Sequence, residues 1–408
     1  MMRCPPFKYV APKSIAEAAS ALADHGPKAM VLAGGTDIVP NLKRRQFAPE
    51  ALISLRNVRE LRGVTLGSDG AAAIGPCSTL ADLALDASIA KSWPGLSRAV
   101  GSVASPLIRA TATLGGNLCV DTRCNYYNQN FEWRQSISFC MKAPSGTAIT
   151  EPGHATCWVA PSSSRCWAVS STDSGPMLMA LGATVTLESK ARGKREIPMT
   201  ALYRDDGMDY IKRAPDEIVT AVRVPAPKGA KSTYWKLRRR GSFDFPVLSV
   251  AASVRFAKSG EVEDAHVVLG AVTSCPLEVQ ETALLLGKKL TDDAIAEFAE
   301  KASAHARPRR PQGNPRRRQG VARRSRPARH ARGELPWLRK PSRQTASPSR
   351  PARSGASGSA APRRSPSSTR LPWKSRWRSA SAAAHSPSRC VRRDSSARWC
   401  WGSCSRKG

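Results

Sequence analysis

Short apolar runs alternate with stretches of helical spacing over the first 306 residues of the chain. Residues 14–25 place Ala, Ile and Leu at helical spacing, and Ser14 with Glu17 in capping-box positions predicts where this helix begins. The apolar run 29–33 predicts a buried strand before a glycine turn. Further strands are expected at 51–55, 71–74, 183–187, 217–224, 247–256 and 265–271, and further helices at 38–45, 80–90, 96–104 and 292–304.

The order of these elements predicts an α+β fold with two domains. Residues 1–225 form the larger expected domain, and residues 231–306 form a smaller α+β domain with an antiparallel sheet, after a linker that contains Pro and Gly. Residues 118–176 lack periodicity and contain Cys, Asn, Ser, Pro and Gly, which predicts a long loop inserted in the first domain. Long loops inside compact domains often carry function.

Two glycine turns lie beside apolar runs of the first domain, Val31-Leu-Ala-Gly-Gly-Thr-Asp-Ile38 and Thr113-Leu-Gly-Gly-Asn117. Glycine lets the backbone turn tightly and leaves its N–H groups open to a ligand. Successive N–H groups in such a turn suit a phosphate, and two such turns suggest a dinucleotide. Neither turn has the G-x-G-x-x-G or P-loop spacing. The alternative is that each is an ordinary turn after a strand.

Most of the net charge of +33 lies in residues 307–408. That segment holds 28 of the 64 Lys and Arg residues but only two of the 31 acids. The first 306 residues are therefore an ordinary soluble body, long enough for two domains. The basic tail has no Ile, Phe, Tyr or Met, yet it holds five tryptophans: Trp337, Trp373, Trp377, Trp399 and Trp401.

Two interpretations account for this low-complexity tail. Arg, Pro, Ala, Gly and Trp have GC-rich codons, and natural disordered basic arms usually carry Lys and avoid Trp. One hypothesis is therefore an aberrant, frame-shifted translation that begins near Arg307. The other is a nucleic-acid-binding arm, in which Arg clusters such as 316–318 neutralise phosphates and Trp side chains stack on bases. An intact reading frame in independent clones of the gene would contradict the first.

Four cysteines of the inserted loop are the second chemical signal. Fifteen residues separate Cys124 from Cys140, sixteen separate Cys140 from Cys157, and eight separate Cys157 from Cys166. A loop with few apolar residues needs another stabilising element, and four thiolates around one metal centre would supply it. Structural zinc usually takes closer pairs, for which Cys119 and Cys124 are the near candidate, so the wide spacings fit a [4Fe–4S] cluster about as well. The alternative is four unlinked thiols.

The remaining features restrict the class of protein. No run approaches the roughly 20 apolar residues that span a bilayer, and residues 1–10 lack a signal-peptide core. We therefore expect a cytoplasmic protein, without a membrane partner, whose cysteines are thiols or metal ligands. No Ser-His-Asp arrangement or carboxylate pair stands out, so no catalytic residue is assigned. This favours a carrier of electrons over a hydrolase.

The glycine motifs resemble those of a known family. Ala33-Gly-Gly-Thr-Asp37 and Ala112-Thr-Leu-Gly-Gly-Asn-Leu118 resemble the two flavin motifs of the FAD-binding subunits of molybdenum hydroxylases, which include xanthine and carbon monoxide dehydrogenases. The segment Asn117-Leu-Cys-Val-Asp-Thr-Arg-Cys-Asn-Tyr-Tyr-Asn-Gln129 resembles more narrowly the beta subunit of 4-hydroxybenzoyl-CoA reductase, whose inserted loop carries a [4Fe–4S] cluster. The resemblance covers residues 5–306. It implies a two-subdomain PCMH-type FAD-binding domain over 1–225 and an incomplete C-terminal flavoprotein domain over 231–306.

The resemblance also implies roles for individual residues. Eight residues of the first turn would hold the FAD pyrophosphate through backbone N–H groups: Val31, Leu32, Ala33, Gly34, Gly35, Thr36, Asp37 and Ile38. Five residues would form the second flavin loop: Thr113, Leu114, Gly115, Gly116 and Asn117. Val103 and Lys236 correspond to residues that contact the cofactor. Four cysteines correspond to the cluster ligands: Cys124, Cys140, Cys157 and Cys166. The gap between Cys140 and Cys157 is longer than in the family, which is tolerable because loop-closure entropy grows slowly with length.

The implied function is that of an electron-transfer subunit in a hetero-oligomer. FAD and the cluster would sit on this chain, and partner subunits would carry molybdopterin and a [2Fe–2S] centre. The implied reaction is the reductive dehydroxylation of an aromatic acyl-CoA, with ferredoxin as electron donor. One alternative is a xanthine-, aldehyde- or carbon monoxide dehydrogenase-type FAD subunit without the extra cluster. Another is a nucleic-acid-binding protein that acts through the basic tail.

Overall fold

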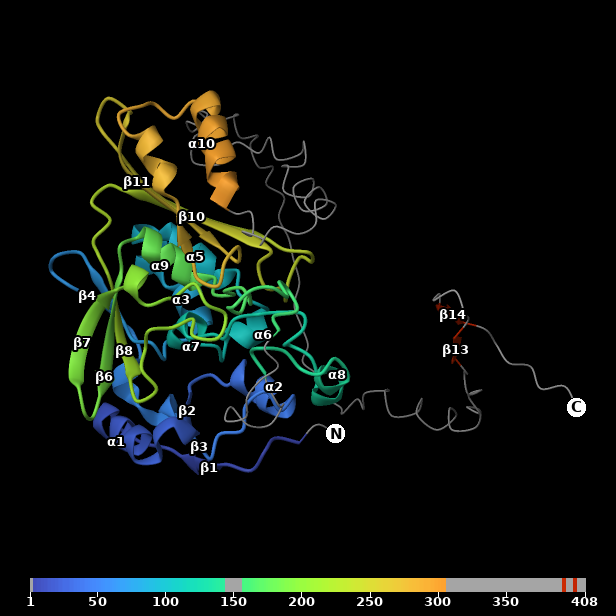
Figure 1. Ribbon diagram of the computed structural model, residues 1–408. Helices are drawn as coiled ribbons and strands as arrows, with labels where there is room; N and C mark the ends of the chain where they lie inside the picture. Colours follow the sequence, from blue (N-terminus) through green and yellow to red (C-terminus); the bar gives the residue numbers. More distant parts are fainter. Residues whose placement is uncertain (1–2, 144–155, 306–390, 394–398, 402–408) are drawn as a thin grey trace, which may run out of the picture. The chain divides into compact units, whose positions relative to one another are not determined.

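The computed structural model describes residues 3–143, 156–305, 391–393 and 399–401 (Figure 1). The chain divides into a compact unit over residues 1–329 and a second unit over 330–408. In the second unit, the structure describes an antiparallel pair of β13 (Val391–Arg393) and β14 (Trp399–Trp401). The rest of the predicted basic tail lies outside the described residues, so both interpretations of it stay predictions.

The first layer of the large unit is a parallel sheet of order β1-β3-β2. Its strands are β1 (Lys8–Val10), β2 (Ala29–Leu32) and β3 (Ala51–Ser54). Helix α1 (Ile15–His25) packs against this sheet through Leu22, which is fully buried. The predicted start of this helix is confirmed, because Ser14 Oγ accepts a hydrogen bond from the Glu17 N–H at 3.2 Å.

The second layer is an antiparallel sheet of order β4-β5-β8-β6-β7. Its strands are β4 (Val64–Leu66), β5 (Ala72–Ile74), β6 (Thr184–Ser189), β7 (Gly193–Pro198) and β8 (Ile218–Val224). Six helices contribute to the core on one face: α3 (Leu80–Leu85), α4 (Ala87–Ser92), α5 (Pro94–Gly101), α6 (Pro106–Arg109), α7 (Leu114–Leu118) and α9 (Ser174–Ala180). Trp93 is buried in this core, and its Nε1–H donates to the Pro225 carbonyl at 2.9 Å.

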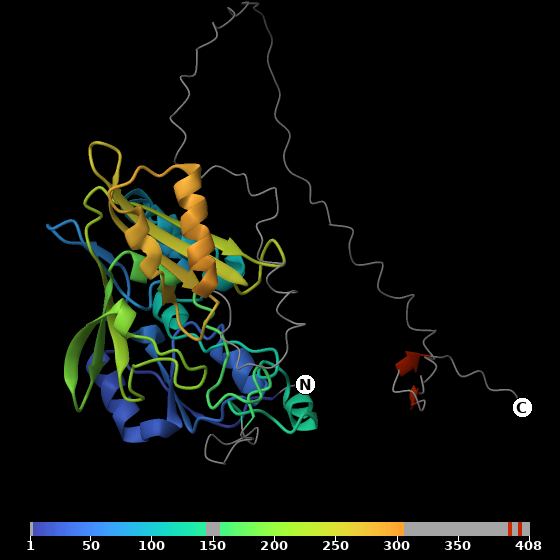
Figure 2. The same cartoon turned by 45° about the horizontal axis from the view of Figure 1, so that its top comes forward.

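The third layer is the predicted antiparallel sheet near the C-terminal end of this unit, of order β12-β11-β10-β9. Its strands are β9 (Lys231–Leu237), β10 (Leu248–Phe256), β11 (Val262–Gly270) and β12 (Leu277–Glu278). One face packs on α5 and α9 through Tyr234, and the other packs against α10 (Asp292–His305), which lies across the sheet in Figure 2. The chain therefore has the predicted α+β fold, with helices between the second and third sheets.

Short 3-10 helices complete the unit: Gly26–Lys28, Leu55–Asn57, Arg59–Leu61, Met199–Ala201 and Gln280–Leu285. Among the described helices, none combines the length and the apolar character that crossing a bilayer requires.

Two predicted elements differ from the structure, and several observed elements, β7 among them, were not predicted. The helix expected at 80–90 is split, because Asp86 Oδ1 accepts hydrogen bonds from the N–H groups of Ser88 and Ile89 and starts α4. The loop expected at 118–176 ends earlier, since α9 begins at Ser174, and it contains the short helix α8 (Phe131–Ser136). Strand β7 was not predicted, because it is an exposed edge strand with polar residues on both faces.

Candidate functional site

The first glycine turn joins β2 to α2 (Ile38–Lys43) and leaves backbone donors open. Within the described residues, the N–H groups of Gly34, Gly35 and Thr36 have no main-chain acceptor. Gly35 has a φ of 76°, in the left-handed region that favours glycine. A run of open N–H groups in such a turn suits a phosphate group, and the binding of the FAD pyrophosphate here stays a prediction.

The predicted second glycine turn, Thr113–Asn117, is the start of helix α7 with Thr113 as its N-cap, and its backbone donors already have partners in the protein. Leu114 N–H donates to the Ser78 carbonyl at 3.1 Å, and Gly115 N–H donates to the Pro76 carbonyl at 2.8 Å. The next two N–H groups, those of Gly116 and Asn117, donate to Oγ1 and O of Thr113. The hydrogen bonds of Leu114 and Gly115 connect the segment to residues 76–78 of the same domain. Its contact with a cofactor stays a prediction.

The two turns meet at Gly34. A Cβ on Gly34 would lie 2.2 Å from the Thr111 carbonyl oxygen, so only glycine allows this backbone approach. Gly34 therefore keeps the open donors of the first turn next to the segment that leads into the second turn.

A buried polar segment connects the second turn to the C-terminal sheet. Asn117 Oδ1 accepts hydrogen bonds from Thr172 Oγ1 at 3.0 Å and from Ser174 Oγ at 2.6 Å. Between them, Asp173 accepts from Lys236 Nζ at 2.9 Å and from the Tyr234 hydroxyl at 2.6 Å. The Asp173 and Lys236 side chains are only 3% and 4% exposed, and burial raises the pKa of Asp173.

Lys236 also brings a third predicted residue into the site. Its Nζ donates to the Ser102 carbonyl at 3.2 Å, directly before Val103. The structure therefore brings Asn117 and Lys236 to one buried polar segment, and the Ser102 carbonyl places the backbone beside Val103 next to it. The sequence did not predict the ion pair of Asp173, because a carboxylate one residue before a helix is typical of a capping residue.

Arg123 was also missed, and it joins three segments. Its guanidinium forms an ion pair with Asp37 of the first turn and lies over the Phe245 ring, 4.6 Å from the centroid. Its backbone pairs with Val169 at the other end of the inserted loop. Burial lowers the pKa of Arg123 to about 10, so the guanidinium stays a cation at neutral pH.

The four predicted cysteines line a single hollow in the inserted loop: Cys124, Cys140, Cys157 and Cys166. Tyr126, Tyr127, Met141, Lys142 and Trp158 complete its described lining. Cys119, the other candidate ligand, lies elsewhere, packed against the main core. A hydrogen bond from the Cys166 thiol lowers the pKa of Cys157 to about 5, and the same bond raises the pKa of Cys166. The four thiols do not form a preformed site for a single metal ion. In the described ranges, no three His, Cys, Asp or Glu side chains are arranged to hold one.

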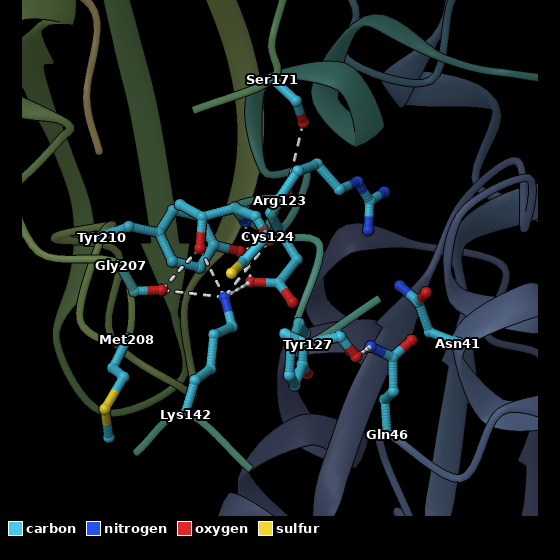
Figure 3. A network of polar contacts seen from close by, with 12 residues as sticks. Asn41, Gln46, Arg123, Cys124, Tyr127, Lys142, Ser171, Gly207, Met208 and Tyr210 are labelled. Carbon is cyan, nitrogen blue, oxygen red and sulfur yellow. Dashed lines mark hydrogen bonds and ion pairs between the residues drawn. The ribbon is translucent and has the colours of Figure 1, made fainter. Parts of the chain in front are cut away.

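Lys142 is the centre of a polar network beside this hollow (Figure 3). Its Nζ donates to Asp121 Oδ1 at 2.5 Å, to Thr122 Oγ1, and to the Gly207 carbonyl at 2.8 Å. The ammonium also lies 4.8 Å from the ring centroid of Tyr127. With a side chain 7% exposed, Lys142 connects the middle of the inserted loop to Asp121 and Thr122 near the start of that loop.

Two family models match the chain over most of the large unit. The first, described as the FAD binding domain in molybdopterin dehydrogenase, matches residues 5–227. The second, described as the CO dehydrogenase flavoprotein C-terminal domain, matches residues 232–325 and so continues past residue 306 into the basic tail. The chain belongs to the family of FAD-binding subunits of molybdenum-dependent dehydrogenases.

Individual relatives agree with this assignment. The aldehyde oxidoreductase FAD-binding subunit PaoB of Escherichia coli K12 is 30% identical over 304 residues, which cover 73% of this chain and 91% of that protein. The carbon monoxide dehydrogenase medium chain of Hydrogenophaga pseudoflava is 26% identical and covers 74% and 88%.

Solved structures share the fold. A chain of carbon monoxide dehydrogenase from H. pseudoflava, in a form that lacks the Mo-pyranopterin moiety of its cofactor, aligns with a TM-score of 0.60 at 25% identity, over 79% of this chain and 94% of that one. A chain of quinoline 2-oxidoreductase from Pseudomonas putida 86 aligns with a TM-score of 0.59 at 25% identity, over 79% and 95%.

Proposed function

We propose that this chain is the FAD-binding electron-transfer subunit of a molybdenum-dependent oxidoreductase complex. The observation that carries the proposal is the first glycine turn, which combines open N–H donors at Gly34, Gly35 and Thr36 with the cation of Arg123 held on Asp37. These groups suit a diphosphate, and Lys236 supplies a second buried cation for the cofactor.

Bound FAD would exchange electrons singly or in pairs, while this chain binds and orients it. Partner subunits would carry the molybdopterin and a [2Fe–2S] centre. The substrate would then react on a partner chain, which agrees with the lack of an assigned catalytic residue here.

The finer proposal is a reductase like 4-hydroxybenzoyl-CoA reductase. It would dehydroxylate an aromatic acyl-CoA with electrons from ferredoxin. A [4Fe–4S] cluster on the four cysteines would transfer electrons to or from the flavin. Support comes from the common hollow of these cysteines and from the Asp121–Gln129 segment that carries the resemblance. Four thiols are the donor set that such a cluster requires.

The second candidate is a subunit of the aldehyde, xanthine or carbon monoxide dehydrogenase type without the extra cluster. The names of the relatives favour it, and so does the lack of a preformed group of three metal ligands in the described residues. In that case, the cysteine loop would be stabilised by its polar contacts alone, with Lys142 as the main anchor.

Anaerobic purification of the full-length chain with its partner subunits separates these candidates. Flavin bands, with broad absorbance beneath them and about four irons per chain beyond the partner centres, would support the reductase. Flavin without the extra iron would support the second candidate. A folded, colourless protein that does not bind added FAD would contradict both. Salt-sensitive binding of single-stranded nucleic acid, lost on deletion of residues 307–408, would instead support the nucleic-acid interpretation.

A further inference from the structure

We infer that Lys142 is an electrostatic positioning residue for the cysteine site and raises the reduction potential of the centre bound there. The inference rests on the proposed [4Fe–4S] cluster and adds a role for a residue outside the ligand set. It starts from the place of Lys142, two residues after Cys140 and in the wall of the hollow.

The ammonium of Lys142 is fixed in place. Asp121, Thr122 and the Gly207 carbonyl accept its hydrogen bonds, so the three N–H donors of the ammonium have acceptors in the protein. The ring faces of Tyr127 and Tyr210 lie 4.8 and 5.6 Å away, where aromatic rings attract a cation. With 7% of the side chain exposed, water screens this charge weakly.

The ion pair of Lys142 is oriented relative to the hollow. Lys142 is part of the lining, whereas Asp121 is not, and no carboxylate is present among the described lining residues. Of the two charges in this pair, the cation therefore belongs to a residue in the wall of the hollow that the four cysteines share, and the carboxylate does not. Asp121 Oδ2 is buried without a hydrogen-bond partner, so the carboxylate depends on Lys142 for compensation.

This orientation has a predictable effect on electron transfer. An iron–sulfur centre on four thiolates gains negative charge when it takes up an electron, and its potential depends on the surrounding charge and exposure. A nearby buried cation stabilises the more negative, reduced form, and a nearby carboxylate disfavours it. Lys142 should therefore raise the potential, and Asp121 should lower it.

The test uses the opposite signs of these two effects. Full-length wild type, K142M and D121N are purified anaerobically, iron and flavin are quantified, and the cluster is titrated with dithionite under EPR. For K142M we expect an about tenfold lower ratio of reduced to oxidised cluster at a fixed potential, equivalent to a midpoint about 59 mV lower. For D121N we expect a shift in the opposite direction. R165M is the matched control, because Arg165 precedes Cys166 but pairs with Asp205 and is not part of the lining.

Each outcome decides the matter. Opposite shifts in the two variants, with R165M unchanged, support the inference. Iron retained with an unchanged midpoint in K142M and D121N overturns it and leaves the proposed cluster intact. Loss of iron in both variants also overturns it, because the pair would then be a purely structural anchor. A wild-type protein that takes up no iron at this site overturns the cluster itself, and the inference with it.

Discussion

Arg123 of the inserted loop forms an ion pair with Asp37 of the first glycine turn, across 86 residues of sequence. The residue after Arg123 is Cys124, so one side chain connects the proposed flavin site to the cysteine hollow. Phe245, from the loop between β9 and β10, covers the same guanidinium. The inserted loop is therefore attached directly to the part of the fold that should hold the cofactor.

Replacement of Arg123 by Met should weaken FAD binding about tenfold, because Asp37 then faces the cofactor without its cation. The free energy of unfolding should fall by about 1.5 kcal/mol, at the lower end for hydrogen bonds to charged groups, since Asp37 is 34% exposed. Fluorescence titration of the apoprotein with FAD measures the first effect. Arg98→Met, on the exposed side of α5, is the control. Equal FAD affinity in both variants would show that the ion pair is incidental.

The turn itself should respond to a single methyl group. In Gly34→Ala, the new Cβ would lie 2.2 Å from the Thr111 carbonyl oxygen, so the two turns must separate. We expect a loss of about 1–3 kcal/mol of stability, as for overpacking, together with loss of flavin. Gly101→Ala is a matched control, because its Cβ would meet only Ala84 Cβ at 3.6 Å. The ratio of flavin absorbance to protein in the purified variants is the measurement, and a yellow Gly34→Ala protein would contradict this role of the glycine.

Capping residues and apolar runs predicted the helices and strands whose own sequence determines where they form. Helix α1 begins where Ser14 caps it, and strands β10 and β11 follow their apolar runs. Strand β9 has Lys at its first and sixth positions, and it is held by pairing with β10, which lies beyond a long loop. The two lysines interrupt the apolar pattern that marks a strand, so the sequence leaves little signal for β9.

The candidate site was predictable only where it depends on local sequence features. Glycine turns and cysteine spacing are sequence features, and the structure brings the four cysteines to one hollow. The polar partners were not predictable, because Asp173 and Arg123 look like ordinary surface residues until the fold buries them against Lys236 and Asp37. The hydrogen bond from Leu114 N–H to the Ser78 carbonyl was not predictable either, because Ser78 lies in a distant segment of the sequence.

The cysteine hollow should be separable from the flavin site. In Cys140→Ser, one ligand of the proposed cluster is replaced by a weaker one, so the iron content at this site should fall while most of the flavin remains. Cys275→Ser is the control, since Cys275 packs against the main core and is not among the described lining residues. Iron and flavin are quantified in the same samples. Unchanged iron in Cys140→Ser would remove this residue from the ligand set.

The buried pair of Asp173 and Lys236 should show strong coupling in a double-mutant cycle. Lys236→Met leaves the Asp173 carboxylate buried with the Tyr234 hydroxyl as its remaining partner, and we expect a cost of about 3–5 kcal/mol in unfolding free energy. The double variant with Asp173→Asn removes both charges and should cost much less than the sum of the single changes. Urea denaturation of the four proteins measures the coupling, and additive costs would show that the pair is not coupled.

The same cycle predicts a dependence on pH. Burial raises the pKa of Asp173 even though Lys236 opposes the shift, so loss of Lys236 should raise that pKa further. A folded state that holds this proton more tightly than the unfolded state loses stability as the pH rises through the raised pKa. Lys236→Met should therefore be less destabilised at about pH 5 than at about pH 8, measured relative to wild type at each pH. The double variant lacks the carboxyl, so its deficit should be nearly equal at the two pH values. A deficit of Lys236→Met that does not change with pH would mean that Asp173 stays ionised and finds another cation.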